Sequence, residues 1–302
     1  MAAIPVHIDQ HRCTGCGLCT TVCPDKTISL QQGNKAYPSG PRCLACGHCL
    51  AVCPAEAIRV EGIITEPAYQ TFPTDNRWLP FGDGDLAQLV RLMRSRRSCR
   101  RYQPRPVPKE ILEDLVAIAT TAPSGTNSQG WTFTILPERP AVIRLGERVA
   151  ASFRRLNRLA ANPLLRTLLK LLGRPALANY HQRYAGTIAQ GLAEWEETGR
   201  DRLFHGAPAA IIIGSTPGSS CPKEDALLAT QNLLLAAHAM GLGSCLIGFA
   251  VAAMSRESAI KTTLGIPAEE TIHAVIALGY PDITFQRLTG RRPTIPRYSS
   301  TL

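Results

Sequence analysis

The sequence predicts an α+β protein built from two domains joined by a linker. Eight of the 11 cysteines lie in the first 53 of its 302 residues, within two copies of one motif. The segment 66–85 then contains three prolines and two glycines, which is typical of a connector. The rest of the chain shows helical and strand patterns and is long enough for one domain. We therefore expect a cysteine-rich domain at 1–65, a linker at 66–85 and a larger domain at 86–302.

The two cysteine motifs indicate iron–sulfur ligation. The stretches "CTGCGLCTTVCP" from Cys13 and "CLACGHCLAVCP" from Cys43 both read C-x2-C-x2-C-x3-C-P. Zinc motifs usually offer cysteines in pairs. Disulfides are disfavoured because the first 12 residues lack the apolar core of a secretory signal. With this spacing, three thiolates bind one cluster and the fourth binds the other.

This part of the chain resembles bacterial two-cluster ferredoxins over about residues 5–62. The predicted ligands are Cys13, Cys16, Cys19 and Cys53 for one [4Fe–4S] cluster, and Cys43, Cys46, Cys49 and Cys23 for the other. Alternating residues predict short strands at 6–9 and 58–62. A unit of this size buries little apolar surface, so we expect the clusters to stabilise its fold as well.

Local patterns predict the first elements of the larger domain. Leu86, Leu89, Val90 and Met93 recur at helical spacing, so a helix should run through 86–102. A second helix at 108–123 follows a proline-rich break. A strand is expected at 131–136.

A buried helix is expected in the second half of this domain. The stretch "NLLLAAHAMGLGS" is apolar on nearly every face, and Gly241 and Gly243 should cap its end. We expect His238 on this helix to be a core residue rather than a catalyst. Cys99, Cys221 and Cys245 are interpreted as small hydrophobic residues rather than redox thiols.

Two polar segments are candidates for ligand binding. Four arginines crowd the end of the first helix, at positions 96, 97, 100 and 101. They form either a solvated face or a site for a phosphate and for the carbonyl groups of a flavin ring. The segment "PSGTNSQGWTFTIL" places small polar residues on a turn before a strand, where they would reach a planar polar ligand.

Four segments, in order, resemble the FMN-dependent nitroreductase family. They are "RRSCRRY", "APSGTNSQGWTF", "DALLATQNLLLAAHAMGLGSCLIGF" (225–249), and "IHAVIALGYPD" (272–282) with "GRRP" (290–293). The resemblance implies a central mixed sheet flanked by helices, with FMN bound at the interface of a homodimer.

The resemblance also implies which residues bind FMN. Arg96, Arg97, Ser98 and Arg100 would contact its phosphate, ribityl chain and ring, and Arg291 and Arg292 would close on the phosphate. Pro123, Ser124, Gly125, Asn127 and Gln129 would come from the neighbouring subunit, and Cys245, Leu246, Ile247 and Gly248 would face the ring. The chain departs from the family pattern at Gly130, where proline is usual, and at Ile247, where some members carry Glu. No catalytic residue is assigned.

The segment 138–205 is expected to form an insertion that caps the flavin. Its part at 144–183 is basic and amphipathic, with nine basic residues, one acidic residue and a stripe of leucines. Its length and charge exclude a transmembrane span. The leucine stripe would pack on the domain or on its dimer mate, and docking on a membrane surface is the alternative.

Charge is divided unevenly between the two parts of the chain. Residues 1–75 carry a net charge of −1, and residues 76–302 carry +11. A basic body attracts acidic proteins or phosphorylated cofactors. Nucleic-acid binding is disfavoured, because no such motif accompanies the charge and aromatic residues form only 6% of the chain.

Together these features predict a cytoplasmic FMN- and iron–sulfur-dependent oxidoreductase. Clusters pass single electrons, whereas FMN accepts them singly and releases them in pairs. An external donor such as ferredoxin would reduce the clusters, because the chain lacks a GxGxxG nucleotide fingerprint; direct reduction by NAD(P)H is a competing route. The acceptor would be a nitro compound, quinone, activated alkene or halide. The alternatives are a dehydrogenase that reduces ferredoxin and a non-catalytic electron-transfer or redox-sensing module.

Overall fold

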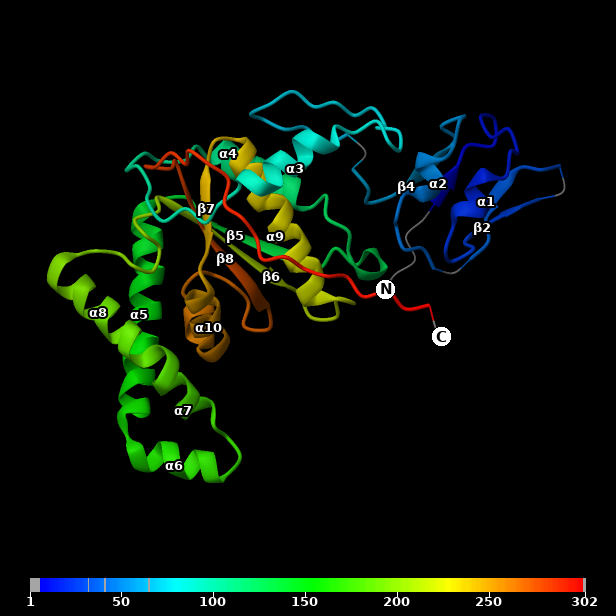
Figure 1. Ribbon diagram of the computed structural model, residues 1–302. Coiled ribbons are helices and arrows are strands. Elements are labelled where there is room, and N and C mark those ends of the chain that lie inside the picture. The colour runs from blue at the N-terminus through cyan, green and yellow to red at the C-terminus, as the bar shows by residue number, and fades with distance from the viewer. Residues whose placement is uncertain (1–5, 32, 41, 65, 301–302) are drawn as a thin grey trace.

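The computed structural model describes residues 6–31, 33–40, 42–64 and 66–300. The ends of the domains predicted at residues 1, 65 and 302 lie outside these ranges. Figure 1 shows a small N-terminal domain (residues 6–64) standing beside a larger C-terminal domain (residues 86–300).

The N-terminal domain is built from two short antiparallel strand pairs. Its elements are β1 (Val6–Ile8), α1 (Leu18–Val22), β2 (Ile28–Leu30), β3 (Ala36–Pro38), α2 (His48–Ala51) and β4 (Ile58–Val60). β1 pairs with β4, and β2 pairs with β3. The strands expected at 6–9 and 58–62 are confirmed. The small core contains Val6, Ile28, Ile58 and Val60 together with buried cysteines.

The connecting segment is attached to the C-terminal domain through one buried carboxylate. Asp114 lies on helix α4 (Lys109–Ala119) and accepts hydrogen bonds from the backbone N–H groups of Gln70 and Thr71 and from the Thr71 hydroxyl. Burial opposes ionisation of Asp114, but these hydrogen bonds outweigh it and lower the pKa. The connector is therefore ordered at this point.

A four-stranded sheet forms the centre of the C-terminal domain. Its order is β5 (Trp131–Leu136), β6 (Ala209–Ser215), β8 (Thr271–Gly279) and β7 (Gly243–Leu246). The strand expected at 131–136 and the α+β class are confirmed. All three strand pairs of this sheet are antiparallel, and the parallel pairing expected of a mixed sheet occurs among the described residues only as an isolated bridge between Ser98 and Ser244.

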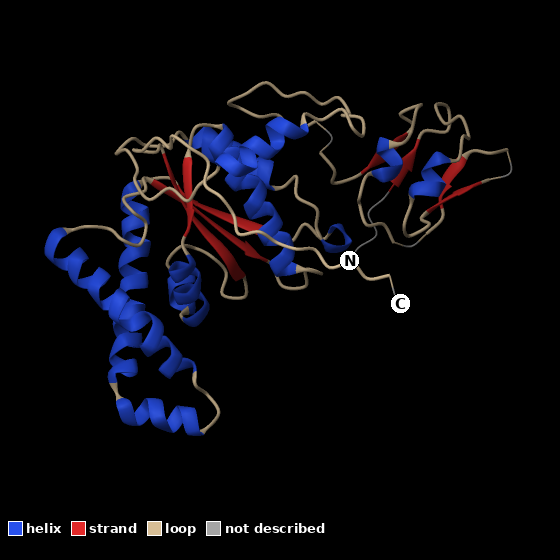
Figure 2. Cartoon of the chain, in the orientation of Figure 1, coloured by secondary structure: helices blue, strands red, loops and turns tan. Residues whose placement is uncertain are grey.

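Helices cover both faces of this sheet (Figure 2). On β6, Ile211 and Ile213 pack with α4 and α9 (Pro222–Ala239), whereas Ile212 packs with α5 (Arg139–Ala161) and α10 (Gly248–Arg256). This alternation follows from the two-residue period of a strand. A short helix α11 (Ser258–Thr262) precedes β8.

The end of α9 positions the strand that follows it. Gly241 has a positive φ of 79° and caps the helix as expected. Gly243 does not cap the helix, because it already belongs to β7. A Cβ atom at Gly243 would lie 2.6 Å from the Cβ of Cys99, so glycine there allows the chain after α3 to approach β7 closely.

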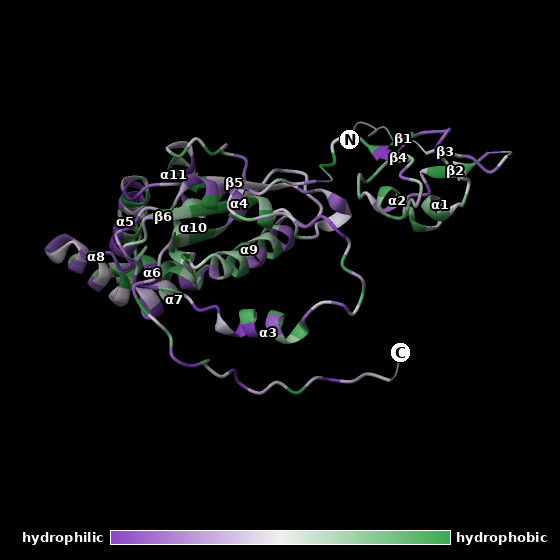
Figure 3. Cartoon of the chain, turned by 90° about the horizontal axis from the view of Figure 1, so that it is seen from above, coloured by the Kyte–Doolittle hydropathy of each residue, from purple (hydrophilic) through white to green (hydrophobic). Residues whose placement is uncertain are grey.

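The first helix of the C-terminal domain is shorter and more exposed than expected. α3 spans Leu86–Ser95, because Arg96 leaves the helical conformation with a ψ of 125°. Its apolar residues Leu86, Leu89, Val90 and Met93 are all exposed in the chain. Figure 3 shows α3 and the C-terminal tail outside the main layers of the domain, and these apolar side chains are only partly covered within the subunit.

The insertion forms a helical arm that projects from the domain (Figure 1). It contains α5, α6 (Pro163–Leu171), α7 (Ala176–Tyr180), a π-helical turn (His181–Ala185) and α8 (Gly186–Thr198). The leucine stripe is only partly covered in the single chain: Leu164 and Leu171 are 80% and 81% exposed, whereas Leu165 and Leu169 are half-buried. In the described part of the chain, no helix is both long enough and apolar enough to cross a membrane.

Candidate functional site

Each predicted set of four cysteines lines its own cavity in the N-terminal domain. One cavity is lined by Cys13, Cys16, Cys19 and Cys53, and the other by Cys23, Cys43, Cys46 and Cys49. The β1–β4 pair brings Cys13 to Cys53, and the β2–β3 pair brings Cys23 to Cys43. Pairing of short strands therefore groups the fourth cysteine of each motif with the first three of the other.

Four thiols line each cavity of the N-terminal domain. Four thiols from C-x2-C-x2-C-x3-C-P motifs around one space suit an iron–sulfur cluster.

Backbone amides point at the sulfur atoms in both cavities. N–H groups donate from Thr27 to Cys23 (3.2 Å), from Ala57 to Cys53 (3.3 Å), from Ala45 to Cys43 (3.3 Å) and from Ala36 to Cys13 (3.5 Å). Such bonds stabilise thiolate ligands and tune the reduction potential of a bound cluster. The donor set therefore fits two iron–sulfur centres.

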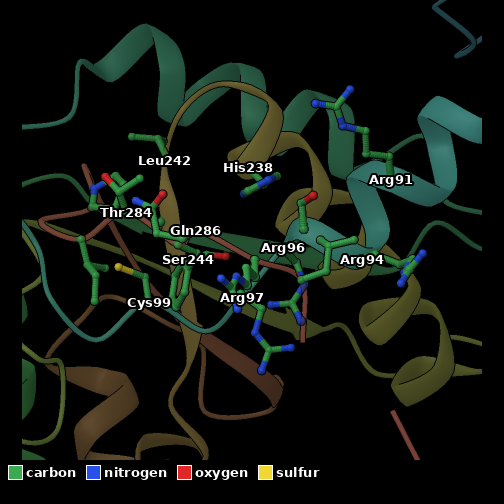
Figure 4. A pocket seen from close by; sticks show the side chains of 17 residues that line it. Arg91, Arg94, Arg96, Arg97, Cys99, His238, Leu242, Ser244, Thr284 and Gln286 are labelled. Carbon is green, nitrogen blue, oxygen red and sulfur yellow. The ribbon is translucent and has the colours of Figure 1, made fainter. Parts of the chain in front are cut away.

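A basic cavity of about 600 Å³ lies where α3 ends against β7. Figure 4 shows Arg96 and Arg97 next to each other in it, with Ser244 of β7 and His238 of α9 nearby. Burial lowers the pKa of Arg96, and the positive charges of Arg97 and Arg291 lower it further. Arg96 and Arg97 line the cavity, and Arg291 lies close enough for its charge to act on Arg96. Within the described ranges, none of them forms an ion pair with an acidic side chain, so an anion would relieve their repulsion.

A second cavity, of about 750 Å³, lies on the other side of the β7 turn. Arg100 and the four turn residues Cys245, Leu246, Ile247 and Gly248 line it. Its far wall comes from the helical arm and α10, and consists of aromatic and basic side chains: Phe153, Tyr180, Arg183, Tyr184, Arg202, Phe249 and Arg256. Residues of the arm and of the turn therefore line the same cavity.

Cys245 lines the second cavity but is only 3% exposed and belongs to the buried core of the domain. Cys245 is buried, and burial raises the pKa of its thiol, an effect only partly offset by nearby Arg100. His238 is half-buried, and burial, with Arg96 adding to it, lowers the pKa of its imidazole. Burial therefore disfavours the charged form of both groups.

The polar segment at 123–129 lies at the opposite end of α9 from the arginines. Asp225, in the first turn of α9, accepts hydrogen bonds from the Gly125 N–H (2.9 Å) and the Ser128 hydroxyl (3.2 Å). His238 lies thirteen residues further along this helix and lines the arginine cavity. At the α-helical rise, that separation is about 20 Å. One subunit therefore does not bring the two halves of the predicted FMN site together.

Within this segment, Asn127 contacts the N-terminal domain. Its Nδ2 donates to the backbone oxygens of Leu44 and Ala45, each at 2.9 Å. Its Oδ1 accepts from Gln129 Nε2 at 3.1 Å. Residues 44–45 belong to the loop between Cys43 and Cys46, so this amide joins the α9 end of the C-terminal domain to a cysteine motif.

The remaining predicted residues are placed as follows. Ser98 bridges to Ser244, next to the arginine cavity. Arg291 and Arg292 both lie exposed in the C-terminal tail and line neither cavity, but the charge of Arg291 acts on Arg96. Pro123 and Ser124 lie in the loop that precedes the 3-10 helix η1 (Gly125–Asn127).

Sequence reasoning did not single out Asp114 or Asp225. Each is a buried acid within an otherwise ordinary helix, and each holds a distant loop through backbone N–H groups. The sequence predicts the arginines of the arm only as part of the basic segment 144–183, with no individual role. No local pattern distinguishes Arg183 from its neighbours, because its position depends on the packing of the arm over β7.

Comparisons with known proteins agree with this architecture. Residues 93–280 match the nitroreductase family, and residues 5–63 match a 4Fe-4S dicluster domain. The chain is 29% identical over 203 residues to a 4-nitrobenzoate reductase of Pseudomonas putida, covering 62% of this chain and 83% of the relative. It is 28% identical over 204 residues to an NADH dehydrogenase of Thermus thermophilus, covering 67% and 89% of the two chains.

The fold is also that of solved flavoproteins. A nitroreductase from Bacteroides fragilis, crystallised with bound FMN, superposes with a TM-score of 0.52 at 22% identity, covering 70% of this chain and 99% of that one. The family match spans more than half of the chain, which confirms the expected class of oxidoreductase. The chain belongs to the nitroreductase family and carries a 4Fe-4S dicluster domain on its N-terminal side.

Proposed function

We propose that the protein is an FMN- and iron–sulfur-dependent reductase. Electrons from an external low-potential donor would pass through two [4Fe–4S] clusters to FMN and on to a small electrophilic substrate. The observation that carries this proposal is the contact of Asn127 with Leu44 and Ala45, which holds a cysteine motif against the C-terminal domain. A domain that served only to stabilise the fold would have no reason to present a cluster loop there.

The two cavities of the N-terminal domain would hold the clusters, with the eight cysteines as ligands. Four backbone N–H groups already point at these sulfurs. We take residues 66–85 as the linker between this unit and the flavin-binding part.

The cluster assignment predicts the iron content of the protein. Anaerobically purified protein should contain about eight iron and eight sulfide per chain. Cys43→Ala should lose about half of each, because it removes a ligand of one cluster only. Cys221→Ala, which changes an exposed cysteine outside both motifs, is the matched control and should keep both. Zinc in place of iron, or a Cys43→Ala protein with full iron, would contradict the assignment.

The basic cavity would hold the FMN phosphate. Arg96, Arg97 and Arg291 supply guanidinium groups that suit a phosphate. Arg100 and the turn 245–248 would contact the ring, with Ser98 and Arg292 nearby. When bound, FMN exchanges electrons singly with the clusters and in pairs with the substrate.

The FMN site would be completed by a second copy of the chain. Residues 123–129 lie about 20 Å along α9 from the arginines, too far to share one FMN within a subunit. A twofold dimer would place the 123–129 segment of one subunit beside the arginines of the other. Exposed apolar residues support this arrangement, since Leu89 and Val90 of α3 and Leu227 and Leu228 of α9 are 41–46% exposed in the single chain.

The second cavity would select small planar substrates that carry a negative charge. Phe249 and Tyr184 stand nearly perpendicular with ring centroids 6.2 Å apart, and the Arg256 guanidinium lies 4.8 Å from the Phe153 ring centre. No Asp or Glu lines this cavity, and in the described chain no ion pair engages Arg100, Arg183 or Arg256. The similarity to a 4-nitrobenzoate reductase supports an aromatic acid as substrate.

For a nitroaromatic substrate the reaction balances with two electrons. The nitro group takes up two electrons and two protons, loses one oxygen as water and becomes a nitroso group. The external donor supplies both electrons, one at a time, and solvent supplies the protons.

Anaerobic turnover with a panel of donors tests this function. Reduced ferredoxin should support reduction of a nitroaromatic acid by the FMN-loaded protein, and the basic C-terminal domain should make the rate fall with added salt if that donor is acidic. Turnover with NAD(P)H but none with ferredoxin would reject the proposed electron path. Absence of turnover with every donor would reject the reductase itself.

A further inference from the structure

We propose that the N-terminal domain of each subunit reduces the FMN held by the arginines of the other subunit. The inference rests on the proposed dimeric reductase and adds the direction of transfer between subunits. It follows from where one chain places its cysteine loop and where it places its arginines.

The cysteine loop docks within its own chain through an amide whose orientation is fixed. The Oδ1 of Asn127 accepts from Gln129, so its Nδ2 must face Leu44 and Ala45, to which it donates. The Ala45 N–H in turn donates to the Cys43 sulfur. A short path of hydrogen bonds and one peptide unit therefore links Asn127 to a predicted cluster ligand.

The docking point is anchored at the first turn of α9. Asp225 is buried and accepts from Gly125 and Ser128, which fixes the segment on either side of Asn127. The arginine cavity lies beside His238, about 20 Å along the same helix. The cluster held by Cys23, Cys43, Cys46 and Cys49 is therefore remote from the arginines of its own subunit.

In the twofold dimer the same cluster lies beside the flavin of the partner subunit. The segment that completes the partner's FMN site contains Asn127. Asn127 in turn binds the cysteine loop of its own chain through Leu44 and Ala45. The cluster of the Cys43 set is then the immediate donor to FMN, and the cluster of the Cys13 set is the one that receives external electrons.

Mixed dimers test this inference directly. Two differently tagged chains are combined so that one carries Cys43→Ala and the other carries Arg96→Ala with Arg291→Ala. The only loaded FMN then sits on the arginines of the Cys43→Ala chain. Transfer between subunits predicts that ferredoxin bleaches this flavin at the wild-type rate, because the intact cluster belongs to the other chain.

The matched control places all three substitutions on one chain and pairs it with a wild-type chain. Transfer between subunits predicts that its flavin bleaches no faster than in the Cys43→Ala homodimer. The opposite pattern, with the control fast and the first mixed dimer slow, overturns the inference and leaves the reductase intact. If ferredoxin bleaches the flavin of neither the mixed dimers nor the wild-type homodimer, the proposed function fails as well.

Cross-linking provides a readout that does not depend on electron transfer. In a Cys221→Ser background with both clusters loaded, Leu44→Cys and Asn127→Cys are joined with a short thiol cross-linker. Docking within one chain predicts that the product migrates as a monomer on a denaturing gel. A covalent dimer would place the cysteine loop on the other subunit and overturn the inference.

Discussion

Replacing Arg96 and Arg291 together by alanine is expected to release FMN while both iron–sulfur clusters stay in place. Each guanidinium would contribute charge-assisted hydrogen bonds to the phosphate, and such bonds contribute about 1.5–3 kcal/mol each. Loss of both should weaken FMN binding by roughly 100-fold or more. Calorimetric titration of the apoflavin protein with FMN measures this change, and iron analysis checks the clusters.

The matched control removes the same charge elsewhere. Arg148 and Arg158 lie exposed on α5, outside both cavities, and their replacement by alanine should leave FMN affinity unchanged. Equal FMN affinity in the Arg96→Ala, Arg291→Ala protein and in the wild type would show that the phosphate binds elsewhere. Loss of iron together with FMN would indicate general unfolding instead.

A carboxylate on the substrate is expected to raise kcat/KM strongly relative to a neutral amide of the same shape. Arg183 and Arg256 face the cavity without an acidic partner among the described residues, so an anion would gain an ion pair in a site walled by aromatic rings. A hydrogen bond to a charged group contributes about 1.5–3 kcal/mol, which corresponds to roughly 10- to 100-fold. Steady-state kinetics with a nitrobenzoate and the matching nitrobenzamide measure the ratio.

Arginine variants separate this effect from general damage. Arg183→Gln and Arg256→Gln should lower kcat/KM for the acid and leave the amide nearly unchanged. Arg166→Gln, on α6 outside the cavity, is the control and should preserve the preference. Equal loss for acid and amide, or no preference in the wild type, would contradict an anion-selective cavity. Calorimetric binding of benzoate and benzamide checks the same point without turnover.

The cysteine motifs could be predicted from sequence because ligand spacing is a local property of the chain. The grouping of Cys23 with Cys43 needs only two short strand pairs, which bring the ends of neighbouring motifs together. The elements around the sheet were also predictable, since strand β5 and helices α4 and α9 carry strong apolar patterns. Helix α3 was predicted too long. The backbone turns at Arg96 because the next residues pair with β7, and no local helix propensity in the sequence indicates this.

Contacts between distant segments could not be predicted in the same way. Asn127 resembles a flavin contact by its motif, but its amide also holds Leu44 and Ala45, which precede it by more than 80 residues. The leucines of α6 were expected to pack on the domain or on its dimer mate, and Leu164 and Leu171 are exposed in the single chain. Such positions depend on how separate units meet, and that information is not carried by periodicity.

The central claim is that the clusters feed electrons to FMN. Stopped-flow absorbance of the flavin under anaerobic conditions tests it most directly, with folded Cys43→Ala protein whose FMN content has been verified. Reduced ferredoxin should bleach this flavin far more slowly than in the wild type, whereas an artificial donor that acts on the flavin itself should bleach both at the same rate. Unchanged bleaching by ferredoxin in Cys43→Ala would contradict the account.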